Sequence, residues 1–327
     1  METFIIPDLN SIKEGAKRIK PFIHKTPVFT CKTFNDMFGG EIYFKCENFQ
    51  KIGAFKIRGA TNAVFSLSEE EVKQGVATHS SGNHAQALAL AARNRGIPAW
   101  VVMPENSKKV KIEAVKNYGA NVILCKPTLK DREKTLGKVI EDTAAVFIHP
   151  YNNMKVIEGQ ATAALEFLKE TGRLDIIMTP VGGGGLLSGT ALCTHYLSPS
   201  TTVTGTEPAL ADDAFRSFRD SVIYPPNTPL SVADGLLTSL GENTFRIIKQ
   251  HVHNIVTVSE ESIISSMKLI WERMKIIVEP SSSVPFAAIM EKKVDIKGKK
   301  AGIILSGGNV DLNHLPWVKD EELLTGA

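Results

Sequence analysis

Short apolar runs alternate with amphipathic segments along most of the chain. The apolar runs are rich in Val and Ile and show little period-two alternation, which predicts strands covered by helices on both faces, as in a parallel sheet. These strands are predicted at 42–46, 76–80, 99–103, 121–125, 146–149, 176–180, 202–207, 255–258 and 301–305. The fold class that this alternation predicts is α/β with largely parallel sheets.

The segments between the apolar runs have the character of helices. Residues 84–94 read HAQALALAARN, with Ala and Leu on several faces, which predicts a well-buried helix. Residues 109–118, 129–142 and 260–274 are also predicted as helices. Gly96 and Gly119 stand at expected C-caps, and Ser259 is a plausible N-cap.

The domain organisation follows from this order of elements. Residues 75–150 hold four predicted strands with three helices between them, which makes a compact unit. We therefore predict a small domain over 75–150 and a large domain formed by 1–74 and 151–327. No internal repeat or low-complexity linker marks the boundaries.

The composition is that of an ordinary globular protein. The 327 residues are 43% hydrophobic and 22% charged, with a net charge of +3 and no basic run, so we expect no nucleic-acid partner. The four cysteines are far apart and form no CxxC pair, which is typical of reduced, buried thiols. No secretory signal and no stretch of about 18–20 apolar residues is present, so we expect a cytoplasmic protein without a membrane partner.

One lysine is distinguished by its sequence context. Lys56 lies in the octapeptide GAFKIRGA, just after the turn at Gly53 and at the start of a predicted helix. The positive end of a helix dipole disfavours an ammonium ion, which lowers the pKa of an amine and makes it a better nucleophile or base. The alternative is a solvated surface lysine.

A run of glycines follows the predicted strand at 176–180. Residues 181–189 read VGGGGLLSG and lead into a predicted helix. Unpaired N–H groups and the helix dipole form an anion site at such a junction, and glycine lets the backbone approach a phosphate closely. The pattern is neither the GxGxxG dinucleotide fingerprint nor a nucleotide P-loop. The alternative is a flexible strand-to-helix turn.

Polar residues also end the predicted strand at 76–80. Residues 80–84 read SSGNH and start a helix, so their N–H groups and side chains can hold a carboxylate. The alternative is N-capping by Ser80, Ser81 or Asn83. We assign His84 no acid–base role, because a histidine in this position is more often structural.

Two further strand ends carry candidate ligands. Residues 303–309 read IILSGGN, where Ser306 begins a glycine turn that, taken alone, is equally a plain strand-end turn. Residues 206–213 read TEPALADD, where Glu207, Asp213 and an intervening carbonyl offer the oxygen ligands that Mg²⁺ or Ca²⁺ prefers. A solvated acidic loop is the alternative for this segment.

Together these motifs resemble the fold-type II enzymes that use pyridoxal 5′-phosphate (PLP), and among them the serine/threonine dehydratase and serine racemase family across nearly the whole chain. The resemblance implies two open twisted sheets flanked by helices, as in the tryptophan synthase β chain, and a mobile small domain. It implies that Lys56 forms the Schiff base with PLP, that Asn83 bonds the phenolic oxygen and that Ser306 faces the pyridine nitrogen. The implied cofactor-binding residues are Phe55, Lys56, Asn83, Tyr151, Gly182, Gly183, Gly184, Gly185, Leu186 and Ser306.

The resemblance also implies roles in substrate and cation binding. Serine at position 81, where threonine dehydratases usually have alanine, is similar to serine racemases and hydroxyaspartate dehydratases, in which Lys56 and Ser81 would exchange protons on opposite faces of Cα. Arg132 matches a position near the active-site mouth. The implied substrate-binding residues are Ser80, Ser81, Gly82, Asn83 and His84, and the implied cation ligands are Glu207, the carbonyl of Ala211, and Asp213.

Some segments depart from the racemase pattern. Glu158 and Ala161 stand where Ala and Gly are common, and the sequence YNN at 151–153 differs from mammalian racemases. The segments ADGLL at 233–237 and VEPSSS at 278–283 look more like bacterial hydroxyamino-acid dehydratases, including those that act on 3-hydroxyaspartate. No long C-terminal extension remains for a regulatory domain, so we do not expect a feedback-inhibited threonine dehydratase.

The predicted function is PLP-dependent dehydration of a β-hydroxy-α-amino acid, such as L-serine or L-threonine, to a keto acid and ammonia, with serine racemisation as a second activity. A dehydratase devoted to 3-hydroxyaspartate is a rival prediction, although its second carboxylate needs a cationic or helix-terminal site that the sequence does not locate. A β-replacement synthase on the same fold, or a non-catalytic PLP carrier or sensor, would also carry these motifs. The family expectation for assembly is a homodimer.

Overall fold

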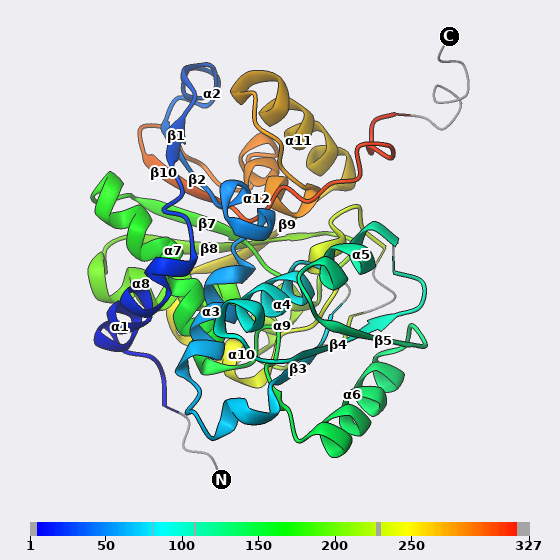
Figure 1. The fold of residues 1–327 in the computed structure, drawn as a ribbon. Coiled ribbons are helices and arrows are strands. Elements are labelled where there is room, and N and C mark those ends of the chain that lie inside the picture. Colours follow the sequence, from blue (N-terminus) through cyan, green and yellow to red (C-terminus); the bar gives the residue numbers. More distant parts are fainter. Residues whose placement is uncertain (1–4, 81, 108, 227–229, 319–327) are drawn as a thin grey trace.

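The protein is built on two separate β-sheets (Figure 1). A computed structural model of the chain describes residues 5–80, 82–107, 109–226 and 230–318. The strands are β1 (Val28–Thr30), β2 (Glu41–Cys46), β3 (Val76–His79), β4 (Ala99–Pro104), β5 (Asn121–Cys125), β6 (Val146–Phe147), β7 (Ile176–Pro180), β8 (Thr202–Pro208), β9 (Asn254–Val258) and β10 (Lys300–Leu305).

Helices account for most of the remaining described chain. They are α1 (Leu9–Ile19), α2 (Lys32–Phe38), α3 (Lys56–Ser66), α4 (Asn83–Arg95), α5 (Lys109–Asn117), α6 (Leu129–Thr143), α7 (Met154–Thr171), α8 (Gly185–Leu197), α9 (Asp213–Asp220), α10 (Glu242–His251), α11 (Glu260–Met274) and α12 (Pro280–Met290). Ser259 caps α11 by accepting from Ser262 N, and Gly96 ends α4 in the left-handed conformation, as the sequence predicts.

The larger sheet has six strands in the order β1-β2-β10-β7-β8-β9. All its pairs are parallel except β1 with β2, which is antiparallel. Helix α12 packs across β7, β8, β9 and β10, with α11 outside it, while α7 and α8 lie on the opposite face (Figure 1). Both faces are therefore covered, which explains why these strands are apolar without alternation.

The smaller sheet has four parallel strands in the order β5-β4-β3-β6. Helices α4 and α5 cover one face and α6 covers the other (Figure 1). All of these elements lie between residues 76 and 143 or in β6, within the predicted range 75–150. That this unit is a separate, mobile domain stays a prediction.

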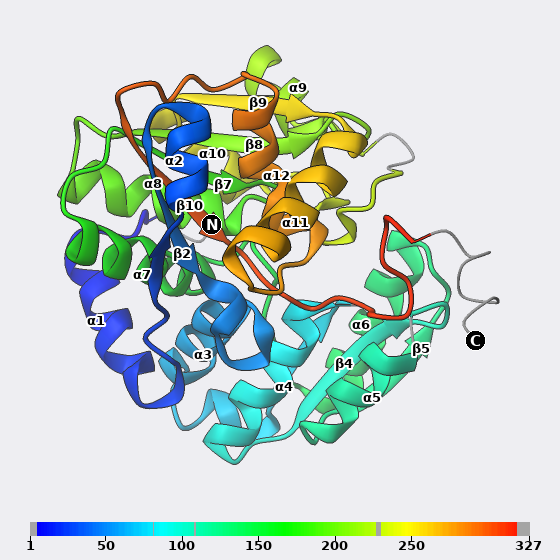
Figure 2. The ribbon, with the colours of Figure 1, turned by 90° about the horizontal axis from the view of Figure 1, so that it is seen from above.

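The strand ends that carry the candidate ligands meet between the two sheets. The turn before α3 joins the end of β10 through a β-bridge between Ala54 and Gly307. Beyond β10 the chain passes beside the smaller sheet and its helices (Figure 2). A cavity of about 430 Å³ is lined there by residues that include Lys111 and Ala114 of α5 and Asn309, Val310, Asp311, His314, Leu315 and Pro316. In the described ranges, no helix is both long and apolar enough to cross a membrane.

Candidate active site

Lys56 is the first residue of α3 and lies between the two sheets. Its Nζ donates to the carbonyl of Pro150 at 3.1 Å, just after β6. The preceding Phe55 donates its backbone N–H to Ser306 O at 3.0 Å, at the end of β10. The candidate lysine and the candidate C-terminal serine are therefore neighbours, although 250 residues separate them (306 − 56) in the sequence.

The surroundings of Lys56 make its amine less basic than an ordinary lysine. Removal from water lowers the pKa of Lys56 to about 8, and the negative charge of Glu279 acts in the opposite direction. The Nζ lies 5.3 Å from the centre of the Phe55 ring. A larger fraction of the amine is consequently neutral near physiological pH, as a nucleophile or base requires.

The glycine run forms the junction between β7 and α8. Gly184 has φ +88°, which favours glycine, and it stands at the N-cap of α8, so no side chain caps the helix. Ser188 N donates to Gly184 O at 2.8 Å and starts the helical bonding. The N–H groups before it, at 185–187, face the helix N-terminus, where an anion is favoured.

Tyr151 lies directly against this loop. A Cβ atom at Gly183 would lie 2.3 Å from two carbons of the Tyr151 ring, so only glycine fits there. The ring is held at its far end, where the Tyr151 hydroxyl and Thr238 Oγ1 are 3.0 Å apart. At its near end, His149 Nδ1 accepts from the backbone N–H of Tyr151 at 3.2 Å.

Asn83, at the start of α4, belongs to a hydrogen-bonded triangle. Its side-chain N–H group donates to both oxygens of Glu279, at 3.0 and 3.2 Å, and Asn309 Nδ2 donates to Asn83 Oδ1 at 2.8 Å. Asn309 N also donates to Glu279 Oε2 at 3.2 Å. The triangle joins the start of α4 to the start of α12 and to the segment after β10. It also fixes the orientation of the Asn83 amide.

Glu279 is a site residue that the sequence motifs did not single out. It is buried at the start of α12, and burial raises its pKa to about 7. The residue stands within the segment VEPSSS. A lone carboxylate between an apolar residue and a run of small residues is the feature of the sequence that could have pointed to a buried acid. Its contact with Asn83 spans 196 residues of sequence, which no local pattern reveals.

Among the residues that the structure describes, the hydrogen-bond partners of Ser306 are neutral. It is 3% exposed, and its Oγ lies 3.0 Å from Ser282 Oγ. Ser282 in turn accepts from Gly307 N and donates to Gly307 O, both at 2.6 Å. The position thus offers a hydroxyl rather than a carboxylate.

The segment at 80–84 is only partly described, because Ser81 lies outside the described residues. The N-cap of α4 is Gly82, without a side-chain capping bond, and Ser80 Oγ accepts only a long 3.4 Å bond from Gly82 N. Capping by Ser80 or Asn83 is therefore wrong. His84 is buried, its Nε2 lies 3.4 Å from Ile148 O, and burial holds its pKa well below the usual range, so the ring stays neutral.

Glu207 and Asp213 meet at the end of β8 and the start of α9. Glu207 accepts from the backbone N–H groups of Ala214 and Phe215 at 2.9 and 2.8 Å. Both oxygens of Asp213 are buried and lack a hydrogen-bond partner among the described residues. Burial raises the pKa of Glu207 to about 9 and that of Asp213 to about 6. Within the same residues, no group of three or more His, Cys, Asp or Glu side chains is arranged to hold a metal ion.

Arg132 of α6 lies near enough to His79 and Tyr151 to act on both electrostatically. Its positive charge lowers the pKa of His79, after the larger effect of burial, and it also acts on the Tyr151 hydroxyl. Its Nε is buried and has no hydrogen-bond partner in the described part of the chain. A buried N–H group without a partner costs free energy and is a reason to look for a ligand.

The comparisons with known proteins identify the family. The family model described as "Pyridoxal-phosphate dependent enzyme" matches residues 19–307. The chain belongs to this family of enzymes. The predicted resemblance, the α/β fold class and the cofactor PLP are thereby confirmed.

Similar proteins share both the sequence and the fold. The chain is 50% identical over 319 residues to a serine racemase of Dictyostelium discoideum, covering 96% of this chain and 98% of that protein. It is 47% identical over 312 residues to a beta-hydroxyaspartate dehydratase of Paracoccus denitrificans, covering 95% and 99%. The structure of maize serine racemase superimposes with a TM-score of 0.92 at 42% identity, covering 94% and 95%.

The residues present fit PLP. An uncapped helix N-terminus with a glycine cradle suits its phosphate, a less basic lysine suits its aldehyde, and a buried hydroxyl suits its ring nitrogen. The contacts of individual residues with the cofactor stay predictions.

Proposed function

We propose that the protein is a dehydratase that removes water from a β-hydroxy-α-amino acid such as L-serine or L-threonine, giving a keto acid and ammonia. The observation that carries this proposal is the meeting of three motifs: Lys56 Nζ donates to the carbonyl of Pro150, the next residue, Tyr151, packs against the glycine loop, and Phe55 N–H donates to Ser306 O. The names of the relatives, serine racemase and beta-hydroxyaspartate dehydratase, support an amino-acid substrate with a polar β-substituent.

The cofactor, when bound, supplies an electron sink that weakens the bonds at the substrate's Cα. We assign its binding to Phe55, Lys56, Asn83, Tyr151, Gly182, Gly183, Gly184, Gly185, Leu186 and Ser306. The backbone N–H groups of the glycine loop would hold the phosphate, and the Tyr151 ring packs against the loop at Gly183. The neutral Ser306 hydroxyl does not hold a proton on the ring nitrogen as a carboxylate would, which favours prompt loss of a β-substituent over transamination.

Lys56 is the base in this proposal. Lys56 would hold the cofactor through its Nζ, and the free Nζ would take the proton from the substrate's Cα. That proton balances the β-hydroxyl, which would leave as water. Ser80, Ser81, Gly82, Asn83 and His84 bind the substrate, with the carboxylate at the N-terminus of α4. Ser81, which lies outside the described residues, is proposed to exchange a proton on the other face of Cα, which gives racemisation as a second activity.

A dehydratase acting on 3-hydroxyaspartate is the second candidate. The sequence alone offers no cation for the extra carboxylate. The buried Nε of Arg132, which has no hydrogen-bond partner among the described residues, supplies a donor near Tyr151 and His79. An arginine fork suits a carboxylate, because it donates two parallel hydrogen bonds.

We also propose that Glu207, the carbonyl of Ala211 and Asp213 bind a divalent cation, Mg²⁺ or Ca²⁺. The two carboxylates and a carbonyl are hard oxygen ligands. The buried oxygens of Asp213, unpartnered among the described residues, support a positive ligand at this point.

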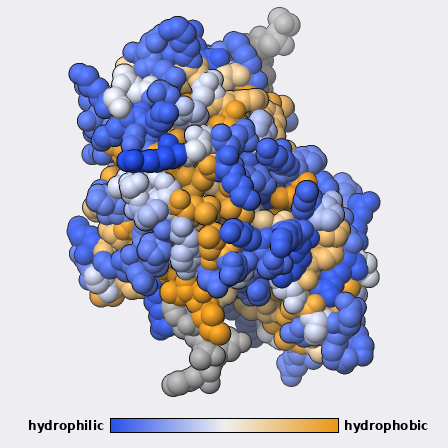
Figure 3. Space-filling view, turned by 90° about the vertical axis from the view of Figure 1, so that its left-hand side faces the viewer, coloured by the Kyte–Doolittle hydropathy of each residue, from blue (hydrophilic) through white to orange (hydrophobic). Residues whose placement is uncertain are grey.

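A homodimer and a cytoplasmic location complete the proposal. Hydrophobic residues gather in a band across the face that carries α1 and α7 (Figure 3), which supports an association surface. Phe29 and Phe49 are 38% and 43% exposed, and the centres of their rings lie 6.0 Å apart. The cytoplasmic location rests on the sequence alone.

Two experiments test the function. The variant Lys56→Ala should lose the absorbance band of the protein-bound cofactor together with ammonia release, and retained turnover would refute the role of Lys56. Rates on serine, threonine and 3-hydroxyaspartate, measured side by side with and without Mg²⁺, decide the substrate. Imine formation without turnover on any of them would instead indicate a carrier or sensor.

The racemisation proposal has its own test. The variant Ser81→Ala should keep dehydration of the L-substrate but lose racemisation and use of the D-substrate. Equal loss of all activities would argue against two bases on opposite faces of Cα.

A further inference from the structure

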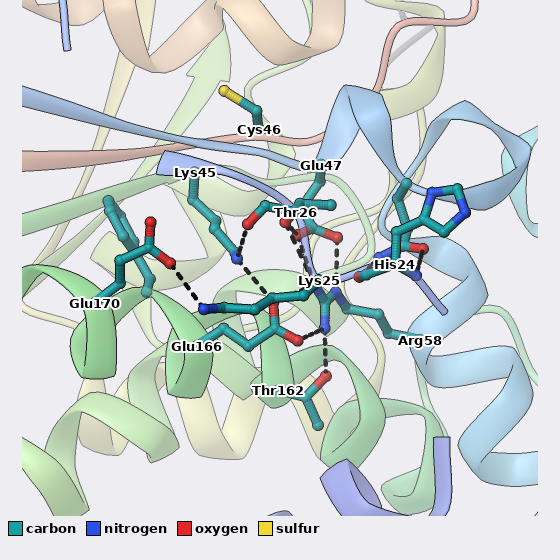
Figure 4. Close-up of polar contacts among 12 residues, drawn as sticks. His24, Lys25, Thr26, Lys45, Cys46, Glu47, Arg58, Thr162, Glu166 and Glu170 are labelled. Carbon is teal, nitrogen blue, oxygen red and sulfur yellow. Dashed lines mark hydrogen bonds and ion pairs between the residues drawn. The ribbon is translucent and has the colours of Figure 1, made fainter. Parts of the chain in front are cut away.

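A network of buried charges lies behind the lysine that we assign to the reaction (Figure 4). Arg58 and Lys45 supply the positive charges, and Glu47 and Glu166 supply the negative charges. The side chains of Arg58, Lys45 and Glu47 are 0% exposed, and that of Glu166 is 22% exposed. Two positive and two negative charges leave the network neutral, so every charge is compensated inside the protein.

Arg58 is bound on two sides through all the N–H groups of its guanidinium. Nε and Nη2 donate to the two oxygens of Glu47 at 2.7 and 2.9 Å. Nη1 and Nη2 donate to the two oxygens of Glu166, each at 2.8 Å. The remaining Nη1 hydrogen goes to Thr162 Oγ1 at 3.2 Å. Two bidentate contacts fix the plane of the guanidinium as well as its position.

Such a network contributes little net stability, because removing charges from water costs about as much as their attraction returns. Its value lies in geometric specificity. Arg58 sits in the first turn of α3, while Glu47 follows β2 and Glu166 belongs to α7. The guanidinium therefore holds the start of α3 against both the larger sheet and its covering helix.

The start of α3 needs such a restraint. Its N-cap, Phe55, makes no side-chain capping bond. Further along, α3 touches α7 through glycines, since a Cβ atom at Gly159 would lie 2.6 Å from Gly59 Cα. From Gly59 onward α3 is fixed to α7, because Gly59 N donates to Gln160 Oε1 at 3.1 Å and Asn62 Nδ2 donates to Lys155 O at 2.8 Å. The ion pairs of Arg58 hold the first turn, which these contacts leave to other groups.

Lys56 precedes Arg58 by two positions. Side chains two apart on a helix point to different sides, so the two cations diverge. Arg58 points to Glu47 and Glu166, whereas Lys56 reaches the carbonyl of Pro150. Turning the first turn of α3 about its axis would move both side chains together, which couples the amine to the guanidinium.

We propose that Arg58 is a positioning residue that sets the rotation of the first turn of α3 and thereby aims the Nζ of Lys56. The proposal rests on the proposed function through the role of Lys56. Loss of Arg58 should therefore slow the reaction of the Lys56 amine by more than any loss of fold stability explains.

Lys45 provides a matched control. Its Nζ donates to Glu166 Oε2 and to Thr26 O, both at 2.7 Å, and it is buried as fully as Arg58. It belongs to the same network but lies on β2, so it does not hold α3. Comparing the variants Arg58→Lys and Lys45→Met therefore distinguishes an effect on the orientation of Lys56 from an effect on the stability of the network.

Three properties should be measured for each variant. The first is the melting temperature of the cofactor-free protein. The second is the rate of covalent PLP attachment, followed by absorbance and located at Lys56 by borohydride reduction and peptide mass analysis. The third is the division of any activity loss between kcat and KM.

Arg58→Lys keeps the positive charge but loses the two bidentate contacts of the guanidinium with Glu47 and Glu166. We expect it to slow PLP attachment and lower kcat by about tenfold or more, with KM little changed, the size that loss of a charge-assisted hydrogen bond gives. Lys45→Met should lower the melting temperature at least as much, while PLP attachment stays within about twofold of the unchanged protein. Attachment that falls in step with melting temperature in both variants, or that is unchanged in Arg58→Lys, overturns the proposal.

The variant Glu47→Gln provides a second route if Arg58→Lys does not fold. It keeps the shape of the side chain, which contacts only Arg58 and Thr26 in the network, and weakens one half of the fork. Slower attachment at an unchanged melting temperature supports the proposal, and attachment at the original rate contradicts it. PLP attachment needs no substrate, so it tests the role of Arg58 independently of dehydration. A protein that binds PLP at Lys56 but dehydrates no substrate would refute the proposed function and leave the attachment test of Arg58 valid.

Discussion

Asn83 donates its side-chain N–H group to both carboxylate oxygens of Glu279, at 3.0 and 3.2 Å. The carboxylate that orients this amide also acts on Lys56, whose pKa it raises against the larger lowering effect of burial. One buried acid thus links the orientation of the asparagine assigned to the cofactor with the basicity of the assigned lysine.

Neutralising Glu279 should make Lys56 less basic. In Glu279→Gln the attraction that favours the ammonium form is lost, so the pKa of Lys56 should fall below about 8 and the neutral amine should be present at lower pH. The pH dependence of PLP attachment to the cofactor-free protein should shift to lower pH. Glu113→Gln, an exposed carboxylate on α5, is the control and should not shift it. A midpoint unchanged in Glu279→Gln would contradict the coupling.

Enlarging the glycine loop should weaken PLP binding. A methyl group at position 183 would overlap the Tyr151 ring, so Gly183→Ala should raise the PLP dissociation constant by about tenfold to a hundredfold through overpacking. The double variant Gly183→Ala/Tyr151→Ala removes the overlap and should recover part of the loss. Equilibrium titration by absorbance measures both. No recovery in the double variant would mean that the methyl group acts elsewhere.

Adding Mg²⁺ or Ca²⁺ should stabilise the protein. A cation that binds the folded chain at about a hundred times its dissociation constant raises the free energy of unfolding by about 2.7 kcal/mol. Thermal melting with and without the cation should show this increase, and Asp213→Asn should abolish it. Asp220→Asn, in an exposed ion pair with Arg219, serves as the control and should keep it. The same increase in Asp213→Asn would place the cation at another site.

Removing the charge of Arg132 should lower the activity on substrates with a second carboxylate and leave the activity on serine nearly unchanged. We expect Arg132→Met to lower kcat/KM for 3-hydroxyaspartate by about tenfold to a hundredfold, because a charge-assisted hydrogen bond is lost, and to leave serine within about threefold. Lys130→Met, an exposed lysine on the same helix, should change neither. Equal losses on both substrates would remove Arg132 from the discrimination.

Much of the fold was predictable because buried parallel strands and their helices leave strong local patterns. Helix α11 was predicted with its exact bounds, and the predicted strands match β5 and β7 residue for residue. The strand that the local patterns did not predict, β1, has only three residues and an exposed edge, so neither its length nor its pattern distinguishes it from a loop. Its antiparallel pairing with β2 is likewise decided by tertiary packing.

The site was predictable only where its chemistry is local. The glycine loop and the octapeptide around Lys56 carry their own signal, because a helix N-terminus is formed by consecutive residues. Glu279 and Arg58 acquire their meaning from partners 196 and 108 residues away. Arg58 even lies within the octapeptide, yet nothing in those eight letters indicates that its charge is buried between two carboxylates.

The backbone contact of Gly59 with Gly159 limits how the protein can change. An ordinary core tolerates exchanges of similar volume, since neighbouring side chains shift to accommodate them. Here the main chains themselves touch, and the smallest side chain would push apart the helix that presents Lys56 and the helix that supports it. Efforts to make the protein more heat-resistant therefore have no room at this crossing, and the exposed faces of α1, α6 and α11 are the places where such changes can be made.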